Sequence, residues 1–134
     1  MVATSPKMAE ELLGLGLPAE TANMCWCTSD FESTWLVPRT PSEVKNSLLE
    51  GEFDDVKLVP AWSLGALLEV MPEKITDGRY NYYLESDLKS EIYYNAIGAM
   101  IPNRKGYTKK DNIFEAAFEM VKWLLKMEII KKSK

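Results

Sequence analysis

The alternation of apolar and polar residues between 80 and 97 constrains the fold of this chain more than any other feature. Every second side chain of a strand points to the same face, so this alternation predicts strands with one buried face. A polar turn at 87–90 divides the pattern into two strands, and Asp77-Gly78 precedes the first of them. An Asp-Gly pair beside extended runs favours a two-residue type I′ turn with positive φ at both residues. The sequence therefore predicts a three-stranded antiparallel meander.

Two apolar stripes at helical spacing predict the helices that cover this sheet. The first stripe lies between Ser63, a potential N-cap, and Pro72, so we expect a nearly inaccessible helix over 63–71. The second follows the potential cap Asn112 and predicts a helix over 112–129. The predicted core comprises Leu64, Leu67, Leu68, Tyr82, Leu84, Ile92, Phe114, Phe118, Val121 and Leu125.

The N-terminal half predicts shorter elements. Pro6 favours a helix as far as Leu13, and Pro18 can open a second, short one. The apolar runs MCWCTS and TWLV favour a hairpin. Thr40 and Glu43 have the spacing of a capping box, which predicts a further helix ending at a glycine. The fold class is therefore α+β, a small antiparallel sheet with several helices packed on it.

Size and composition are those of one globular domain. The 134 residues, 46% of them apolar and 27% charged, suffice to bury one core. We expect a single domain over 1–134 with a frayed tail at 131–134. No apolar run has the length of a signal-peptide core or a membrane span. A soluble, cytoplasmic protein that does not contact membranes is the expectation.

Residues that usually carry catalysis or bind metals are scarce. The chain has no histidine, which removes His-based triads and the commonest metal ligand. Cys25 and Cys27 are two apart, point to one face of a strand and are interpreted as reduced thiols in a core. The acidic run at 50–55 lacks EF-hand spacing and is interpreted as a solvated loop. The sequence therefore predicts no enzyme, no cofactor and no metal site.

Charge is distributed unevenly along the chain. The net charge is −4, but residues 1–60 carry −6 and residues 101–134 carry +5. A basic loop is expected at 102–111, where basic side chains flank an aromatic one. A solvated rim is the more frequent meaning of such a run, and a polyanion site is the alternative. The candidates for an interaction surface are Trp35, Arg104, Lys105, Tyr107, Lys109 and Lys110.

Several segments together resemble a known group of sequences. They are PAWSLGALLEVMP at 60–72, TANMCW at 21–26, the tyrosine-rich meander and the C-terminal helix. In their order along the chain, with TANMCW first, they are similar to a family of short uncharacterised proteins from Bacteroides-type gut bacteria and their phages or mobile elements. The resemblance spans nearly the whole chain and implies a small cytoplasmic accessory protein. It brings no catalytic residues with it.

Two functions from different classes follow. The first is a non-enzymatic module, encoded by a phage-like element, that binds another protein. The alternative is a nucleic-acid-associated protein that uses the basic C-terminal third. A contiguous positive surface would favour the alternative, and an exposed apolar patch around Trp26 or Trp35 would favour the first.

Overall fold

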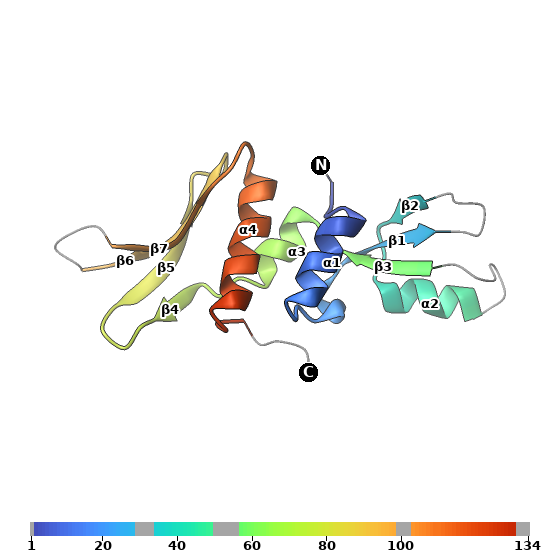
Figure 1. Ribbon diagram of the computed structural model, residues 1–134, viewed down its shortest axis with the longest axis horizontal. Helices are drawn as coiled ribbons and strands as arrows, with labels where there is room; N and C mark the ends of the chain where they lie inside the picture. Colours follow the sequence, from blue (N-terminus) through green and yellow to red (C-terminus); the bar gives the residue numbers. More distant parts are fainter. Residues whose placement is uncertain (1, 29–33, 50–56, 99–102, 131–134) are drawn as a thin grey trace. The chain divides into compact units, whose positions relative to one another are not determined.

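The computed structural model describes residues 2–28, 34–49, 57–98 and 103–130, except for the side chains of 47–49. The predictions for the acidic run and the C-terminal tail fall outside these residues. The fold is α+β, as predicted, with two small antiparallel sheets and helices beside them (Figure 1). The chain divides into two compact units, one of residues 1–66 with 133–134 and one of residues 67–132. The single-domain expectation stays a prediction.

The helices and strands follow one another in the order shown in Figure 1. They are α1 (Pro6–Gly14), a 3₁₀ turn η1 (Ala19–Thr21), β1 (Met24–Thr28), β2 (Thr34–Val37), α2 (Pro41–Leu49), β3 (Lys57–Ala61), α3 (Leu64–Glu69), β4 (Lys74–Thr76), β5 (Asn81–Ser86), β6 (Glu91–Ala96), β7 (Arg104–Lys109) and α4 (Ile113–Lys126).

The sheet of the first unit has the strand order β2-β1-β3. The β1–β2 hairpin was predicted and is confirmed, whereas β3 was not predicted. Pro60 in β3 is compatible with an edge strand, because an edge strand can spare a backbone donor. The predicted capping box begins α2, with Glu43 N donating to Thr40 Oγ1 and Thr40 N donating to Glu43 Oε1, both at 3.2 Å. Both β2 and β3 thus pair with β1, and α2 begins with the cap that its sequence predicted.

The chain before α1 is tied to the segment after β3. Thr4 N donates to Trp62 O at 2.9 Å, and Trp62 N donates to Thr4 Oγ1 at 3.0 Å. The indole of Trp62 donates to Thr21 Oγ1, and that of Trp26 donates to Thr4 O. Thr4 and Trp62 are both fully buried, so these bonds satisfy polar groups that water does not reach. Residues almost 60 positions apart in the sequence therefore anchor one another.

Helix α3 is shorter and less buried than predicted. Ser63 Oγ accepts from Ala66 N at 3.2 Å, which confirms the predicted N-cap. Leu67 is fully buried, but Leu64 and Leu68 are half-buried and Gly65 is exposed. The prediction of a nearly inaccessible helix was wrong, because a helix of less than two turns covers its apolar stripe on one side only.

The sheet of the second unit has the strand order β4-β5-β6-β7, and each strand pairs with the next along the chain. The meander β4-β5-β6 confirms the prediction from the alternating pattern. The expected basic loop at 102–111 was wrong, because Arg104–Lys109 forms the edge strand β7. Lys and Gly are depleted in strands, so the pairing with β6 outweighs the low strand propensity of Lys105 and Gly106.

The turn between β4 and β5 differs from the predicted two-residue type I′ turn. Thr76 pairs with Asn81, so four residues form the connection, and Gly78 (φ +89°) has positive φ whereas Asp77 does not. The reason is the Asp77 carboxylate, whose Oδ1 accepts from Arg79 N at 2.9 Å and from Tyr80 N at 2.8 Å. The side chain of Asp77 thereby replaces the backbone geometry that a type I′ turn would supply.

Helix α4 lies along one face of this sheet, in contact with β6 and β7 (Figure 1). Asn112 Oδ1 accepts from Glu115 N at 2.9 Å, which confirms the predicted N-cap. Thr108 of β7 donates to Ala116 O of the helix at 3.1 Å. The predicted core residues that are buried are Leu67, Tyr82, Ile92, Phe114, Phe118, Val121 and Leu125, while Leu64, Leu68 and Leu84 are half-buried.

Candidate interaction surface

The face of the second sheet opposite α4 carries tyrosines and charged side chains. Along β6, Ile92, Tyr94 and Ala96 are buried on the helix side, so the intervening residues lie on the opposite face. Within the described part of the second unit, no helix covers that face (Figure 1). We call it the tyrosine face and define it by residues of β5, β6 and β7: Tyr83, Glu91, Tyr93, Arg104, Tyr107 and Lys109.

A β-bulge in β7 determines which side chains reach the tyrosine face. Ile92 pairs with Thr108 and Tyr94 pairs with Lys105, so two steps along β6 match three steps along β7. Gly106, with φ +62°, lies at this extra position. Residues three apart in a regular strand point to opposite faces, whereas the bulge allows side chains at 104 and 107 to share one.

Gly106 also allows β7 to approach α4 closely. A Cβ at this position would lie 2.7 Å from two ring carbons of Trp123 and 3.1 Å from Met120 Sδ. No side chain larger than hydrogen fits there without displacing the indole. The bulge therefore depends on glycine for its backbone conformation and for its packing.

Arg104 lies over two aromatic rings of the tyrosine face. Its guanidinium carbon is 4.3 Å from the ring centroid of Tyr93 and 5.8 Å from that of Tyr107. The two ring centroids are 5.9 Å apart. Such stacking is attractive, because the ring faces carry partial negative charge. It also restricts the rotamers of a long side chain that is exposed to solvent.

Glu91 balances the positive charge beside this cluster. Its Oε1 accepts from the Tyr107 hydroxyl at 2.7 Å and lies 3.7 Å from Lys109 Nζ. This hydrogen bond, followed by partial burial, raises the pKa of the Tyr107 phenol. The hydrogen bond to Glu91 holds the Tyr107 ring beside Arg104.

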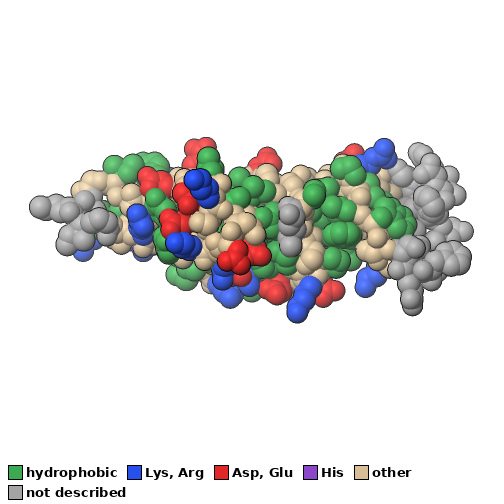
Figure 2. Space-filling view, turned by 90° about the horizontal axis from the view of Figure 1, so that it is seen from above, with side chains coloured by type: hydrophobic (Ala, Val, Ile, Leu, Met, Phe, Trp, Pro, Cys, Tyr) green, Lys and Arg blue, Asp and Glu red, His purple; other side chains and the backbone are tan. Residues whose placement is uncertain are grey.

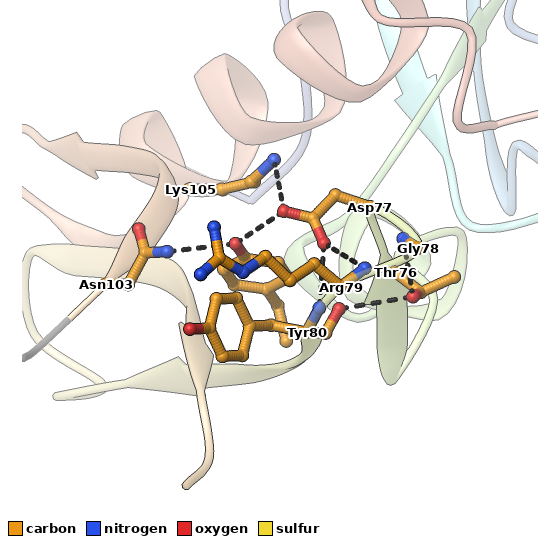
Figure 3. Close-up of polar contacts among 8 residues, drawn as sticks. Thr76, Asp77, Gly78, Arg79, Tyr80, Asn103 and Lys105 are labelled. Atoms are coloured by element: carbon orange, nitrogen blue, oxygen red, sulfur yellow. Dashed lines mark hydrogen bonds and ion pairs between the residues drawn. The ribbon is translucent and has the colours of Figure 1, made fainter. Parts of the chain in front are cut away.

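Lys105 lies on the other side of the sheet and has a structural role (Figure 3). Its Nζ is 3.3 Å from Asp77 Oδ2 and 5.0 Å from the ring centroid of Tyr82. The Tyr82 hydroxyl donates to the same carboxylate oxygen at 2.8 Å and accepts from Asn103 Nδ2 at 3.0 Å. Hydrogen bonds from the backbone N–H groups of the turn and from Tyr82, with Lys105, hold the pKa of Asp77 well below its usual range.

The other sequence candidates lie outside the tyrosine face. Lys110 follows β7, donates its backbone N–H to Ser90 O at 3.0 Å and has an exposed side chain. Trp35 belongs to the first unit, where it pairs with Cys27 across β1 and β2 and is 37% exposed. Of the six candidates, the structure therefore brings together Arg104, Tyr107 and Lys109.

Three members of the tyrosine face were not among the sequence candidates: Tyr83, Glu91 and Tyr93. Tyr83 is 38% exposed on β5. Tyr93 lies on the neighbouring strand β6, where it pairs with Glu85 of β5. The alternation that predicted the meander contained the signal, since the residues between buried positions must point outward. Glu91 was missed because its bond to Tyr107 joins two strands that the sequence did not predict as neighbours.

The two cysteines are buried in a core, as was predicted. Cys25 and Cys27 are free thiols, buried with Val44 of α2. Burial, followed by the neighbouring Cys27, raises the pKa of the Cys25 thiol to about 11. Burial raises the pKa of Cys27 as well. A thiol with a raised pKa is a poor nucleophile, because the thiolate is the reactive form.

Among the described residues, no three His, Cys, Asp or Glu side chains converge in a way that could hold a metal ion. No buried side-chain nitrogen or oxygen among them lacks a hydrogen-bond partner. The described helices include none with the length and apolar character needed to cross a membrane.

Comparisons with protein-family models, with curated proteins and with solved structures find no match to this chain.

Proposed function

We propose that this protein is a non-enzymatic binding module that contacts another protein through the tyrosine face. Tyrosine and arginine are the residue types that dominate binding energy at the centres of protein interfaces. Here three tyrosines and one arginine lie together on an open sheet face, and Tyr83 and Tyr107 are 38% and 47% exposed. The stack of Arg104 over Tyr93 is the observation that carries the proposal. A side chain that is already ordered loses less entropy on binding.

The proposed setting is the cytoplasm of a cell that carries a phage-like element, as the sequence resemblance implies. The reduced, buried cysteines are consistent with it. An accessory protein in this setting acts by occupying a surface of a host or phage protein.

The nucleic-acid alternative has less support from the charges. Lys105 is bound to Asp77 and Lys109 lies beside Glu91, so two of the basic side chains on β7 are already neutralised. Figure 2 shows acidic and basic side chains intermingled, without a contiguous positive surface in that view. A polyanion site needs several cations free to release counterions from phosphates. Tyrosines on neighbouring strands can stack on bases, so the experiments below also measure binding to nucleic acid.

The test is affinity capture from a nuclease-treated native host lysate with wild type, Tyr93→Ser/Tyr107→Ser and Lys110→Ser. We expect the same protein to be captured by wild type and by Lys110→Ser and lost with the double variant. Thermal melting of each bait shows that it is folded. Equal capture by all three baits would contradict the proposal.

A second arm measures anisotropy of labelled single- and double-stranded oligonucleotides. No appreciable binding is expected at physiological salt. Micromolar binding that weakens with salt and with Tyr93→Ser/Tyr107→Ser would replace the protein partner by nucleic acid.

A further inference from the structure

The backbone at Leu88 has a conformation that leucine rarely adopts. Its φ is +62°, in the left-handed region where an L side chain crowds the backbone. Among the described residues, Glu128 is the other non-glycine residue with positive φ. Glu128 follows α4 and donates its backbone N–H to Leu125 O, which is a common way to end a helix. Leu88 lies in the turn between β5 and β6, so a helix end does not explain its conformation.

The turn between β4 and β5 has the same hydrogen bonds with a glycine in place of the leucine. The two sequences are Thr76-Asp77-Gly78 and Ser86-Asp87-Leu88, and the third residue of each has positive φ. The hydroxyl of the first residue accepts from the N–H of the third, at 3.1 Å for Gly78 (Figure 3) and 2.9 Å for Leu88. Oδ1 of each aspartate accepts from the next two N–H groups. Glycine avoids strain at this position, and leucine does not.

No packing within the protein compensates for the strain at Leu88. Its side chain is 77% exposed, and no other large apolar side chain in the described ranges is more exposed. The turn beneath it is well ordered, because Asp87 Oδ1 accepts from the N–H groups of Lys89, Ser90 and Glu91. A strained residue that persists in a well-determined turn is typical of functional sites.

The surroundings of Leu88 favour a pocket of a protein over a lipid surface. Exposed Glu85 and Lys89 on either side carry opposite charges. A single leucine offers too little apolar surface to hold a protein on a bilayer, and a glutamate is repelled by anionic lipids. A single apolar side chain on a rigid turn instead suits a pocket of its own size, because little entropy is lost when it binds. This turn shares Glu91 with the tyrosine face.

We infer that Leu88 is an apolar anchor that inserts into an apolar pocket of the protein partner. This inference rests on the proposed function and adds the partner's chemistry to it. Binding removes from water an apolar side chain that the free protein leaves exposed, and the turn that presents it is already formed.

The first measurement tests the strain by thermal melting of Leu88→Asn, Leu88→Ala and Gly78→Leu. Leu88→Asn should raise the melting temperature by about 2–4 °C, because asparagine tolerates the left-handed region. Leu88→Ala should leave it nearly unchanged, since alanine keeps the Cβ that causes the strain. Gly78→Leu should lower it, although its Cβ meets nothing within 4 Å. An unchanged or lower melting temperature in Leu88→Asn would overturn the inference.

The second measurement tests the anchor. The protein captured from the nuclease-treated host lysate is identified, purified and titrated against each full-length variant. Leu88→Asn and Leu88→Ala should each weaken binding about tenfold or more, because they remove the apolar group that enters the pocket. Leu88→Met should weaken it about threefold or less, since methionine has a similar volume. Gly78→Leu should bind like wild type. A variant that is more stable and binds less well cannot be explained by loss of folding.

The outcomes separate the inference from the proposed function. Equal affinity of wild type and Leu88→Asn, with loss in Tyr93→Ser/Tyr107→Ser, would overturn the inference and leave the function intact. Loss in Leu88→Asn alone would support the anchor and contradict the tyrosine face as the contact. Capture of no protein would count against both. Binding of wild type to phosphatidylcholine–phosphatidylserine vesicles, or self-association of wild type, that disappears in Leu88→Asn would replace the pocket by lipid or by a second copy and overturn the inference.

Discussion

The two sheets differ in how far apart in the sequence their neighbouring strands lie. In the second unit every strand pairs with the next one, and short connections join β4, β5 and β6. In the first unit β1 pairs with β3, although β2 and α2 lie between these two strands in the sequence. Thr4 likewise forms a hydrogen bond with the distant residue Trp62. The sheet built from local hairpins was predicted in most of its strands, while β3 was missed. Closing a longer loop costs more entropy and leaves no local sequence signal.

The largest effects are expected from one fully buried aromatic residue in each unit. Trp62→Ala and Tyr94→Ala each remove a fully buried ring and should lower the free energy of unfolding by about 3–5 kcal/mol. If the chain is one domain, either change lowers the stability of both sheets together. Chemical denaturation followed by hydrogen exchange measures this. Loss of protection confined to the substituted unit would contradict the single-domain prediction.

The next effect distinguishes two glycines of the second sheet. Gly106→Ala should cost about 2–4 kcal/mol, because it combines positive φ with a Cβ in collision with Trp123. Gly78→Ala, at φ +89° with nothing within 4 Å of its Cβ, should cost only about 1–2 kcal/mol. Urea denaturation of both variants measures the difference. Equal costs would mean that β7 does not approach α4 as closely as the structure shows.

A smaller effect compares one threonine in each unit. Thr4→Val removes the acceptor of the buried Trp62 N–H and should cost about 1–3 kcal/mol. Thr108→Val removes a donor to Ala116 O and should cost about 0.5–1.5 kcal/mol, since no buried donor is left without an acceptor. Thermal melting ranks the two variants. The reverse order would indicate that the contact between the chain before α1 and Trp62 contributes little.

The smallest effect concerns acid stability. Hydrogen bonds lower the pKa of Asp77 in the second unit and of Glu43 in the first. A carboxyl whose pKa is lowered by folding stabilises the fold above its unfolded pKa of about 4. That contribution is lost as the pH falls through the lower folded pKa. In wild type we expect the melting temperature to fall as the pH drops below 4. Asp77→Asn should reduce this fall more than Glu43→Gln does. The reason is that backbone, hydroxyl and lysine donors all converge on the Asp77 carboxylate. An unchanged pH profile in Asp77→Asn would contradict this.

The candidate site could be predicted only in part. Arg104, Tyr107 and Lys109 were selected from a basic run beside an aromatic residue, and the structure places them on one face. Lys105 was selected by the same criterion, but strand alternation points it to the Asp77 carboxylate instead. Composition identifies a cluster of residue types, whereas the direction of each side chain depends on strand register.

The sequence by itself determined the local features: the caps at Thr40, Ser63 and Asn112, and the strands of the meander. Each of these features depends on residues within a few positions of one another, so the sequence alone is enough to predict it. Only the tertiary structure decided that β7 pairs with β6, that a bulge forms at Gly106, and that Arg104 therefore lies over the rings of Tyr93 and Tyr107. The physical reason is that one added residue in a strand reverses the face of every side chain beyond it. That insertion requires a glycine, because a Cβ at residue 106 would collide with the Trp123 ring of α4.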